Sequence, residues 1–411
     1  MANNMMDLTS FVGKLLKEDD SDILRDGIKA LAQMIMEAEV SSKIGAAPYE
    51  RSDARTAYRN GYRTRAWDTR VGTVELKIPK VTAGTYFPSL LEPRKRAEKA
   101  LQAVIVEAYV KGVSTRKVDD LVKALGIDGI SKSEVSRICK SLDEDVKAFL
   151  SRPIEEEHPY VWLDATFHKV RELGRVVSVA TVVAVAVDED GHRHVLGCDT
   201  GPSEDHAFWT RFLRSLVKRG LKGVRLVVSD SHEGLKAAVA KVFPEATWQR
   251  SSVRRVHFMR NLLSTVTKGA QEAVAALVRT IFAQPDRASA MEHLGEVAAM
   301  LRRKFPQAAD LLEDAAEDVL AYMHFPREHW RQLHSTNTLE RINKELKRRT
   351  RVVGIFPNRD SLVRMVATLL QEQDDEWQVS DRRYFSIESM RRIDIQLEGG
   401  ETAKELLAAI A

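Results

Sequence analysis

One stretch decides how this chain of 411 residues is read: Tyr160-Val161-Trp162-Leu163-Asp164-Ala165-Thr166-Phe167. It is short, apolar and rich in bulky side chains, which predicts a buried β-strand. One carboxylate, Asp164, lies within it. A carboxylate in a buried strand is costly unless it is paired or binds a cation. Asp164 is therefore a candidate functional residue, and a purely structural buried aspartate is the alternative.

The segments that follow alternate between strand and helix patterns. Residues 176–187 form the longest mostly apolar run, which is rich in β-branched residues and too short to span a bilayer, so we predict a second strand at 175–187. Asp188-Glu189-Asp190-Gly191 closes it as a hairpin turn. Three hairpin-like strands, a helix, a fourth strand and further helices are the order of a ribonuclease-H-like domain, within a mixed α+β fold of the α/β class. The other predicted strands are at residues 194–198, 224–229 and near Thr247, and the predicted helices at 206–219, 232–243 and from about 253.

Changes in composition mark the expected domain boundaries. Arg152-Pro153 and the acidic run at 155–157 indicate a linker. Residues 263–330 show no strand signal and carry alanine and leucine at helical spacing, which predicts an all-helical insertion. We expect a mainly helical, basic DNA-binding region at 1–95, a helix-turn-helix-like DNA-binding domain at 96–152, a first part of the core at 155–262, the insertion at 263–334, a second part of the core with a catalytic glutamate at 335–395, and a tail at 396–411.

The N-terminal region combines helix signals with a basic, aromatic stretch. Residues 8–45 carry apolar residues at helical spacing, residues 71–79 predict a short strand, and residues 94–110 predict a basic helix. Between residues 46 and 70 the helical pattern is lost, and arginines are interleaved with tyrosine and tryptophan. We expect DNA contacts from this stretch at Arg55, Arg59, Tyr62 and Arg63.

Residues 112–142 predict two short helices joined by a tight turn. Ser114 caps the first helix, Gly126-Ile127-Asp128-Gly129 makes the turn, and Ser131 or Ser133 caps the second. A plain helical hairpin without DNA contact would show the same pattern. The polar outer face of the second helix favours DNA binding, with contacts expected at Lys132, Ser133, Ser136 and Arg137.

A second carboxylate, Asp230, lies immediately after the strand predicted at 224–229. A carboxylate at the end of a buried strand is costly unless it is paired or binds a cation. A helix is predicted to start directly afterwards, so a helix N-cap is the alternative role for Asp230.

A third carboxylate lies on a strongly basic helix that starts near Asn337. At about 100° per residue, Leu339, Ile342 and Leu346 form an apolar stripe, and Glu340 shares a polar stripe with cations. Glu340 alone is explained by an ordinary surface pair with a lysine, and Glu345, between the stripes, competes for the functional role. The cations are dense enough to bind phosphates, which favours a functional Glu340. We expect DNA contacts at Lys344, Lys347, Arg348 and Arg351.

Three carboxylates from distant segments suit hard divalent cations, because Mg²⁺ and Mn²⁺ prefer oxygen ligands. Two such ions would activate an attacking hydroxyl and stabilise the leaving oxygen in phosphodiester cleavage. The sequence therefore predicts two ions per active site, Mg²⁺ or Mn²⁺, held by Asp164, Asp230 and Glu340.

Two further residues have open roles. His257 either orients a carboxylate or touches the scissile phosphate, or it is structural. Trp330, shortly before the Glu340 helix, either stacks on a displaced base or belongs to the core of the helical insertion.

The whole-chain composition sets the remaining limits. The net charge is only +4, from 63 Lys and Arg against 59 Asp and Glu, so charge distribution matters more than net charge for nucleic-acid binding. Cys139 and Cys198 match no zinc spacing and are expected to be reduced thiols. Residues 1–11 show no signal-peptide pattern. We expect a cytoplasmic, nucleoid-associated protein without a membrane partner.

Several motifs together resemble a known family. The chain resembles the mutator-type (MULE-like) bacterial insertion-sequence transposases, which are DDE transposases, over nearly its whole length. The motifs are Arg51-Ser-Asp-Ala-Arg-Thr-Ala-Tyr-Arg-Asn-Gly-Tyr-Arg, Gly112-Val-Ser-Thr-Arg, Leu163-Asp-Ala, Val228-Ser-Asp-Ser-His-Glu-Gly-Leu, Trp248-Gln-Arg, Val256-His-Phe-Met-Arg-Asn and Asn337-Thr-Leu-Glu-Arg-Ile-Asn.

The resemblance implies that Asp164, Asp230 and Glu340 form the catalytic triad of a homodimer acting on double-stranded DNA. The DNA partners it implies are terminal inverted repeats, bound by the N-terminal module, and target DNA. One position departs from the family, which has Cys or Asp three residues before the histidine that corresponds to His257, whereas this chain has Arg254. A related nuclease that cuts without joining and an inactive DNA-binding regulator are the alternative functions.

Overall fold

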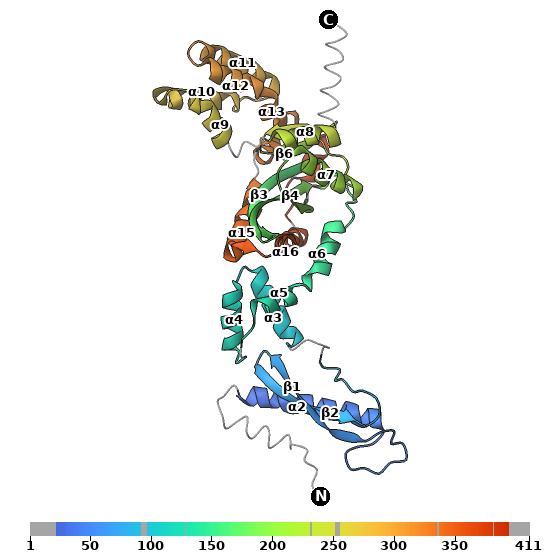
Figure 1. The fold of residues 1–411 in the computed structure, drawn as a ribbon. Helices are drawn as coiled ribbons and strands as arrows, with labels where there is room; N and C mark the ends of the chain where they lie inside the picture. The colour runs from blue at the N-terminus through green and yellow to red at the C-terminus, as the bar shows by residue number, and fades with distance from the viewer. Residues whose placement is uncertain are drawn as a thin grey trace. The chain divides into compact units, whose positions relative to one another are not determined.

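The computed structural model describes residues 22–91, 97–127, 129–230, 232–250, 255–334, 337–380 and 382–393. The chain divides into two compact units, Met1–Ser141 and Leu142–Ala411, and each is described by itself. Helices and strands occur in both units (Figure 1). The mixture of helices and strands agrees with the expected mixed fold class.

The first unit opens with a long helix packed on a β-hairpin. Helix α2 (Asp22–Ile44) lies against the antiparallel strands β1 (Arg59–Thr69) and β2 (Gly72–Val81). Its buried Met36 shares a core with residues of β2. Apolar residues at helical spacing predict this helix, but several of them, Leu24, Leu31 and Met34, are more than half exposed. The helix therefore buries a neighbouring face, which carries Ala32, Met36, Val40 and Ile44.

The first strand of this hairpin was not expected from the sequence. Strand β2 alternates buried and exposed residues, which is the pattern that predicts a half-buried strand. Strand β1 has no such alternation, because most of its residues are exposed or half-buried. Because arginines occupy several of its positions, β1 lacks the alternation of apolar and polar residues that predicts a strand. Residues 59–69, for which no regular element was predicted, thus form a strand.

Three helices complete the described part of the first unit: α3 (Lys99–Val110), α4 (Thr115–Ala124) and α5 (Lys132–Cys139). Ser114 caps α4 by accepting a hydrogen bond from the Lys117 amide at 3.3 Å. Ser131, not Ser133, caps α5 by accepting from the Glu134 amide at 3.1 Å. The expected pair of capped helices is present, with Val135 and Ile138 buried.

The second unit is built on a six-stranded sheet with the order β5-β4-β3-β6-β7, in which β8 pairs with β3. Strand β3 is antiparallel to β4 and parallel to β6, and β6 is parallel to β7. The strands predicted from the sequence are present, with ends shifted by a few residues. Their bounds are β3 (Tyr160–Glu172), β4 (Arg175–Val187), β5 (Arg193–Gly201), β6 (Leu226–Ser229), β7 (Thr247–Arg250) and β8 (Ile355–Phe356).

The two faces of the sheet are covered by different segments. Helices α7 (His206–Lys218) and α8 (Glu233–Val242) pack on the face that carries Val161 and Leu163. On β3 the side chains alternate between faces, so Tyr160, Trp162 and Asp164 point to the other face. There the ring of Trp162 contacts Tyr384, and the ring of Tyr160 contacts Phe325 and Phe385.

Two late helices complete the core of the second unit: α15 (Asn337–Val353) and α16 (Arg359–Val379). Asp374 of α16 is buried; it accepts a hydrogen bond from the Val195 amide at 2.6 Å and pairs with Arg152 at 2.9 Å. Near the other end of α16, Arg364 pairs with Asp143 of α6 (Leu142–Ser151) at 2.6 Å. These contacts hold α16 beside β5 and α6.

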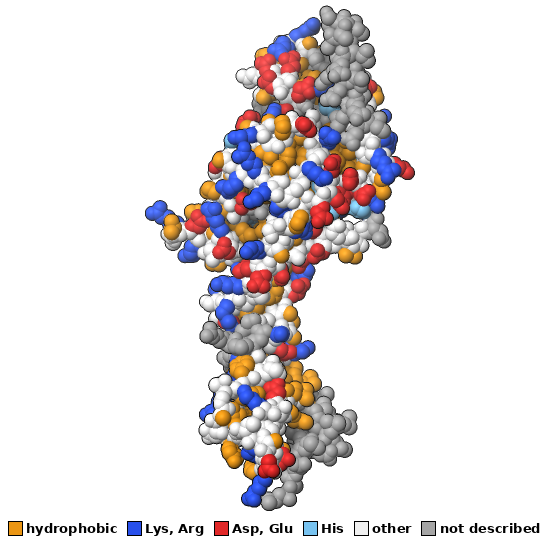
Figure 2. Space-filling model, turned by 90° about the vertical axis from the view of Figure 1, so that its right-hand side faces the viewer, with side chains coloured by type: hydrophobic (Ala, Val, Ile, Leu, Met, Phe, Trp, Pro, Cys, Tyr) orange, Lys and Arg blue, Asp and Glu red, His pale blue; other side chains and the backbone are white. Residues whose placement is uncertain are grey.

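Between residues 263 and 334, the described residues form only helices and turns (Figure 1). Of the helices among the described residues, none has the length and apolar composition that crossing a lipid bilayer requires. Cationic and anionic side chains are interspersed over the visible face of the second unit (Figure 2), which agrees with the small net charge. The remaining α-helices of the second unit are α9 (Arg255–Ser264), α10 (Gln271–Ile281), α11 (Arg287–Arg302), α12 (Pro306–Asp314), α13 (Ala316–Leu320), α14 (Trp330–Leu333) and α17 (Ile387–Met390).

Candidate catalytic centre

Asp164 and Asp230 directly follow two residues that are paired on neighbouring strands of the sheet. Strands β3 and β6 are parallel and pair Leu163 with Ser229, so the residues that follow them are Asp164 and Asp230. Neighbouring strands lie about 4.8 Å apart, and residues at the same register point to the same side. Both carboxylates are half-buried. The topology therefore brings together two carboxylates that are far apart in the sequence.

Asp230 does not cap the following helix. The N-cap of α8 is His232, whose Nδ1 accepts a hydrogen bond from the Leu235 amide at 3.3 Å. The helix-cap alternative for Asp230 is therefore wrong. The carboxylate remains at the end of the strand, beside Asp164.

Asp164 is connected to the late helix α15 by a side-chain hydrogen bond. The Nδ2 of Asn343 donates to the Oδ2 of Asp164, and Asn343 is only 5% exposed. The other oxygen, Oδ1, accepts from the Ala165 amide at 2.8 Å. Both carboxylate oxygens thus have a donor, and α15 is held against β3 at the level of Asp164.

Helix α15 separates its apolar and polar residues as the sequence predicts. Leu339, Ile342 and Leu346 are buried. Glu340 is exposed and lies three residues before Asn343, so about 60° separates them around the helix and about 4.5 Å along it. Glu340 therefore lies on the same side of α15 as the residue that contacts Asp164. The other residues of its polar stripe, Lys344, Lys347 and Arg351, are exposed too.

Glu345, the competing carboxylate, is engaged elsewhere. It accepts hydrogen bonds from Arg348 and Arg349, each at 2.7 Å. The Arg348 hydrogen bond is the main cause that lowers the pKa of Glu345 to about 2. Arg349 is buried and also pairs with Glu372 of α16 at 3.0 Å. Glu345 thus belongs to an ion-pair network that links α15 to α16. Arg348 is paired with Glu345 in the same network.

Two further charged residues surround Asp230. Arg250 ends β7 and pairs in register with Ser229, and its pKa is lowered by burial, an effect that the charges of Asp318 and Asp230 oppose. Burial raises the pKa of Glu204, and the charge of Asp230 raises it further. Neither residue, nor Asn343, is among the site residues predicted from the sequence. Asn343 was within reach, because it lies three residues after Glu340 in the same motif.

The residues of the β-hairpin that were expected to contact DNA differ in whether their side chains contact α2 or face solvent. Arg59 is half-buried and binds the Ser41 hydroxyl at 2.7 Å, with Glu37 at 3.5 Å. The hydroxyl of Tyr62 donates to Glu37 at 2.9 Å. These two side chains fasten the hairpin to α2. Arg63 is exposed, with its guanidinium 6.0 Å from the Phe87 ring.

Arg55 is held by its own loop. Its guanidinium donates to the carbonyls of Ala47 and Glu50 and lies 5.2 Å from the Tyr58 ring. On α5, Lys132 and Ser133 are exposed and Ser136 is half-buried. Arg137, which is also exposed, pairs with Glu134 on the same helix. Within the first unit, Arg63, Lys132 and Ser133 are exposed and have no acidic partner among the described residues.

His257 and Trp330 are the two residues to which the sequence assigns alternative roles. The side chain of His257 lies outside the described residues. Trp330 is half-buried; its indole N–H donates to the Phe325 carbonyl at 2.7 Å, and its ring contacts Tyr322 at 5.5 Å between centroids. These contacts fit a core tryptophan of the helical segment.

A second polar cluster lies beyond the N-terminal end of β3, where β3 pairs with the last residues of β4. Glu156, Asp188 and His194 bring their ligand atoms within 4.8 Å of one another. Asp188 is five residues along β4 from Val183, the partner of Asp164, which corresponds to roughly 17 Å. Burial raises the pKa of Asp188, but hydrogen bonds from His194 and the His192 amide outweigh it and hold this pKa at about 2. The cluster is separate from Asp164 and Asp230.

Comparisons with known proteins identify the family and several relatives of this chain. Residues 3–380 match the family description "Transposase, Mutator family". The chain is 43% identical over 403 residues to the transposase for insertion sequence element IS1081 of Mycobacterium tuberculosis, which covers 97% of this chain and 96% of that one. It is 41% identical to the IS406 transposase of Burkholderia multivorans, over 88% of this chain and 93% of that one.

A third relative extends the comparison to another bacterial group. The chain is 36% identical to the transposase for IS256 in transposon Tn4001 of Staphylococcus aureus, over 89% of this chain and 94% of that one. All three relatives are named as transposases of insertion sequence elements. With the family match over nearly the whole chain, these relatives show that the protein belongs to the Mutator family of transposases.

Proposed function

We propose that this protein is a DDE transposase that binds the terminal inverted repeats of an insertion sequence, cleaves a DNA strand at the element end and joins the 3′-OH to target DNA. The single observation that carries the proposal is the pairing of Leu163 with Ser229, because it brings Asp164 and Asp230 together on neighbouring parallel strands. Glu340 is the third carboxylate, on the helix that Asn343 holds against Asp164.

The sheet supports a ribonuclease-H-like core. Three antiparallel strands in chain order are followed by a helix and then by two strands parallel to β3, which gives the order β5-β4-β3-β6-β7. The helical segment between β7 and α15 supports an all-helical insertion ahead of the catalytic glutamate. In this arrangement Asp164 and Asp230 belong to the first part of the core and Glu340 to the second.

The donor set fits two divalent metal ions. Asp164, Asp230 and Glu340 offer only oxygen ligands, which suits Mg²⁺ or Mn²⁺. When bound, the ions supply an activated hydroxyl nucleophile and a neutralised leaving oxygen. The Asn343 amide fixes the orientation of the Asp164 carboxylate, as outer partners of metal ligands commonly do. Lys344, Lys347 and Arg351 share the exposed stripe of Glu340 and are proposed to hold the phosphates on either side of the cleaved bond.

The first unit is proposed to bind the element ends. Its exposed cations on β1 and α5, among them Arg63 and Lys132, are available for phosphate contacts. A homodimer would pair two DNA ends. The large apolar side chains exposed on α2, Leu24, Leu31 and Met34, form the kind of surface that a second copy covers. Such a protein would act on chromosomal DNA in the nucleoid.

Strand transfer with labelled oligonucleotides tests the proposal. The substrate is the element's own end with a free 3′-OH, incubated with target duplex and Mg²⁺. We expect Asp164→Asn, Asp230→Asn and Glu340→Gln each to abolish joining while end binding survives. Asp375→Asn removes an exposed carboxylate from α16 and is the matched control with normal joining.

Each of the alternative functions predicts a different result in the same assay. Cutting without joining would identify a nuclease. End binding with neither reaction would identify an inactive regulator. Normal joining by Glu340→Gln would show that the third ligand is misassigned, and Glu345 would become the candidate.

A further inference from the structure

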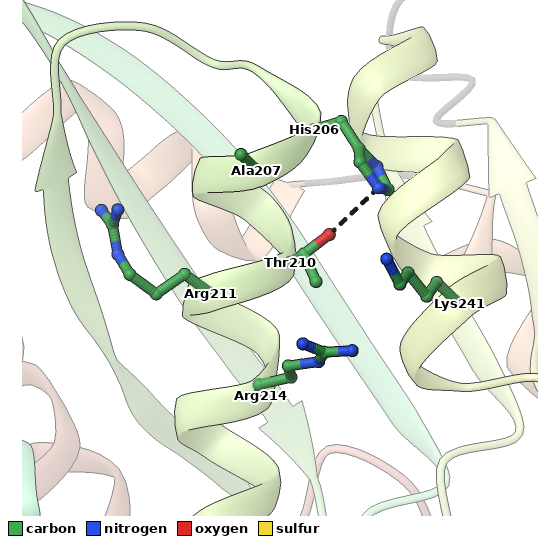
Figure 3. A pocket seen from close by; sticks show the side chains of 6 residues that line it. All are labelled: His206, Ala207, Thr210, Arg211, Arg214 and Lys241. Carbon is green, nitrogen blue, oxygen red and sulfur yellow. Dashed lines mark hydrogen bonds between the residues drawn. The ribbon is translucent and has the colours of Figure 1, made fainter.

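A cationic groove lies between α7 and α8 in the second unit. Its volume is about 400 Å³, and none of its lining residues is acidic (Figure 3). The lining residues are His206, Ala207, Thr210, Arg211, Arg214 and Lys241. A cleft lined by one sign of charge concentrates ligands of the opposite sign. The groove therefore favours an anionic ligand.

The two helices approach each other closely at their first turns. A side chain at Gly234 of α8 would meet the backbone nitrogen of His206 at 2.9 Å. The ring nitrogen Nδ1 of His206 lies 3.4 Å from the Gly234 carbonyl oxygen. Arg214 follows His206 by eight residues, which is about 12 Å along α7. The groove is thus long enough for several phosphates, since a DNA strand advances about 3.4 Å per nucleotide along the duplex axis.

Within the part of the chain that the structure describes, two cations in the groove have no counter-ion. Arg214 and Lys241 are exposed, and among the described residues neither has a hydrogen bond or an ion pair. Figure 3 shows both side chains directed into the space between the helices. Arg211 differs, because it points away from Lys241, with its guanidinium 3.7 Å from Asp199 and 5.1 Å from the Phe208 ring. Arg214 and Lys241 are therefore the charges that a bound anion would neutralise.

The His206 end of the groove lies at the edge of the sheet where β6 ends and Asp230 follows. Helix α8 begins at Glu233, three residues after Asp230, and both helices direct their N-terminal ends to this edge. The N-terminal end of a helix carries partial positive charge, which adds to the attraction for phosphate. The His206 end is therefore the end of the groove nearer to Asp230, although α7 and α8 cover the sheet face opposite to the one that Asp164 faces.

We propose that the α7–α8 groove binds the phosphate backbone of DNA beyond the cleavage position, with Arg214 and Lys241 as the contacts. This inference rests on the proposed function, since it takes Asp230 as part of the catalytic centre. The DNA has two possible sources with the same chemistry: the flank adjoining the element end, and the target. The backbone is bound without reading bases, because cations of this kind contact phosphate oxygens.

The test compares two double variants that remove the same charge. Arg214→Ala/Lys241→Ala empties the groove of its uncompensated cations. Lys268→Ala/Arg303→Ala removes two exposed cations, both outside α7 and α8, that do not line it. All four positions are exposed, so both variants are expected to fold. Binding is measured by fluorescence anisotropy over a range of KCl concentrations.

Three DNA duplexes separate the sources. The first ends at the cleavage position, the second carries flanking DNA beyond it, and the third is target DNA without an element end. For the groove variant we expect the slope of log K against log [salt] to become shallower by about 2, because each lost phosphate contact contributes about 0.9. A change on the second duplex only assigns the flank, and a change on the third only assigns the target.

Two outcomes overturn the inference. One is equal binding by the two double variants on all three duplexes. The other is a loss of the same size on the first duplex, which has no DNA beyond the cleavage position. The outcome for the proposed function is separate, because it depends on whether the wild-type protein cuts and joins. If the wild type does neither, the binding comparison still reports on the groove.

Discussion

The side-chain amide of Asn343 on α15 donates a hydrogen bond to the carboxylate of Asp164 on β3, across 179 residues of sequence. This contact fixes where α15 lies along β3, and therefore where Glu340 lies. It also places an amide donor behind a proposed metal ligand. Asn343 is thus a positioning residue in the proposed centre.

Replacing Asn343 should weaken metal use without unfolding the protein. We expect Asn343→Ala to lower strand transfer by roughly 10–100-fold, because outer partners of metal ligands commonly contribute that much to metal affinity or activity. The Mg²⁺ concentration for half-maximal joining should rise. A merely structural role would lower the amount of active protein and leave this concentration unchanged, and that outcome would contradict the assignment.

Asp374 should be a stability residue. Its carboxylate is buried and holds both the Val195 amide and Arg152. We expect Asp374→Ala to lower the free energy of unfolding by about 2–3 kcal/mol, since it leaves a buried amide and a one-third-exposed arginine without their partner. Urea unfolding measures the change. The exposed neighbour Asp375→Asn is the control and should stay within about 0.5 kcal/mol of the wild type.

The buried imidazole of His329 should make the fold sensitive to acid. Its pKa is lowered by burial from 6.5 to about 4, and its Nδ1 lies 2.8 Å from the hydroxyl of Tyr160. Between pH 6.5 and 4 the unfolded chain takes up a proton that the folded protein does not, so stability falls as pH falls.

The variant His329→Gln isolates this contribution. Below about pH 6, the slope of unfolding free energy against pH should be shallower than in the wild type by about 1.4 kcal/mol per pH unit, which corresponds to one proton. Denaturant unfolding at pH 4.5, 5.5 and 7 gives the slope. Parallel profiles for the two proteins would show that His329 is protonated in the folded state.

Two hairpin glycines provide a matched test of packing. Gly174 and Gly191 both have positive φ, at 80° and 85°. A side chain at Gly191 would meet the Phe385 carbonyl oxygen at 2.1 Å, whereas one at Gly174 would meet nothing within 4 Å. We expect Gly174→Ala to cost about 1 kcal/mol from backbone strain and Gly191→Ala about 1–3 kcal/mol more. Equal thermal stability of the two variants would argue against the contact with Phe385.

How far the sequence predicts this structure differs between elements. Apolar runs located β3, β4 and β6, and Asp164 and Asp230 were singled out because carboxylates are unusual in and directly after such strands. Their adjacency needs the parallel pairing of β3 with β6, which no local pattern contains. The cap alternative for Asp230 could be rejected only once His232 was seen to cap α8.

Other features depended on contacts that a single sequence does not display. Arginines hide the apolar alternation in β1, so the hairpin was missed. Arg59 is predicted to contact DNA on charge alone, yet it is half-buried against Ser41 and Glu37. The sequence shows that these residues are arginines. Only their contacts in the folded protein show whether the guanidinium group faces solvent.

The proposed metal site is tested by counting the Mn²⁺ ions that the protein binds on the DNA of its element end, by electron paramagnetic resonance titration. If Asp164, Asp230 and Glu340 form the metal site, the triple variant with Asn, Asn and Gln at these positions should bind two ions fewer than the wild type. Glu345→Gln should bind as many as the wild type. The cluster of Glu156, Asp188 and His194 is the same in the wild type and the triple variant. Any ion that this cluster binds therefore cancels when the two ion counts are subtracted. The same number of ions on the wild type and the triple variant would contradict the account.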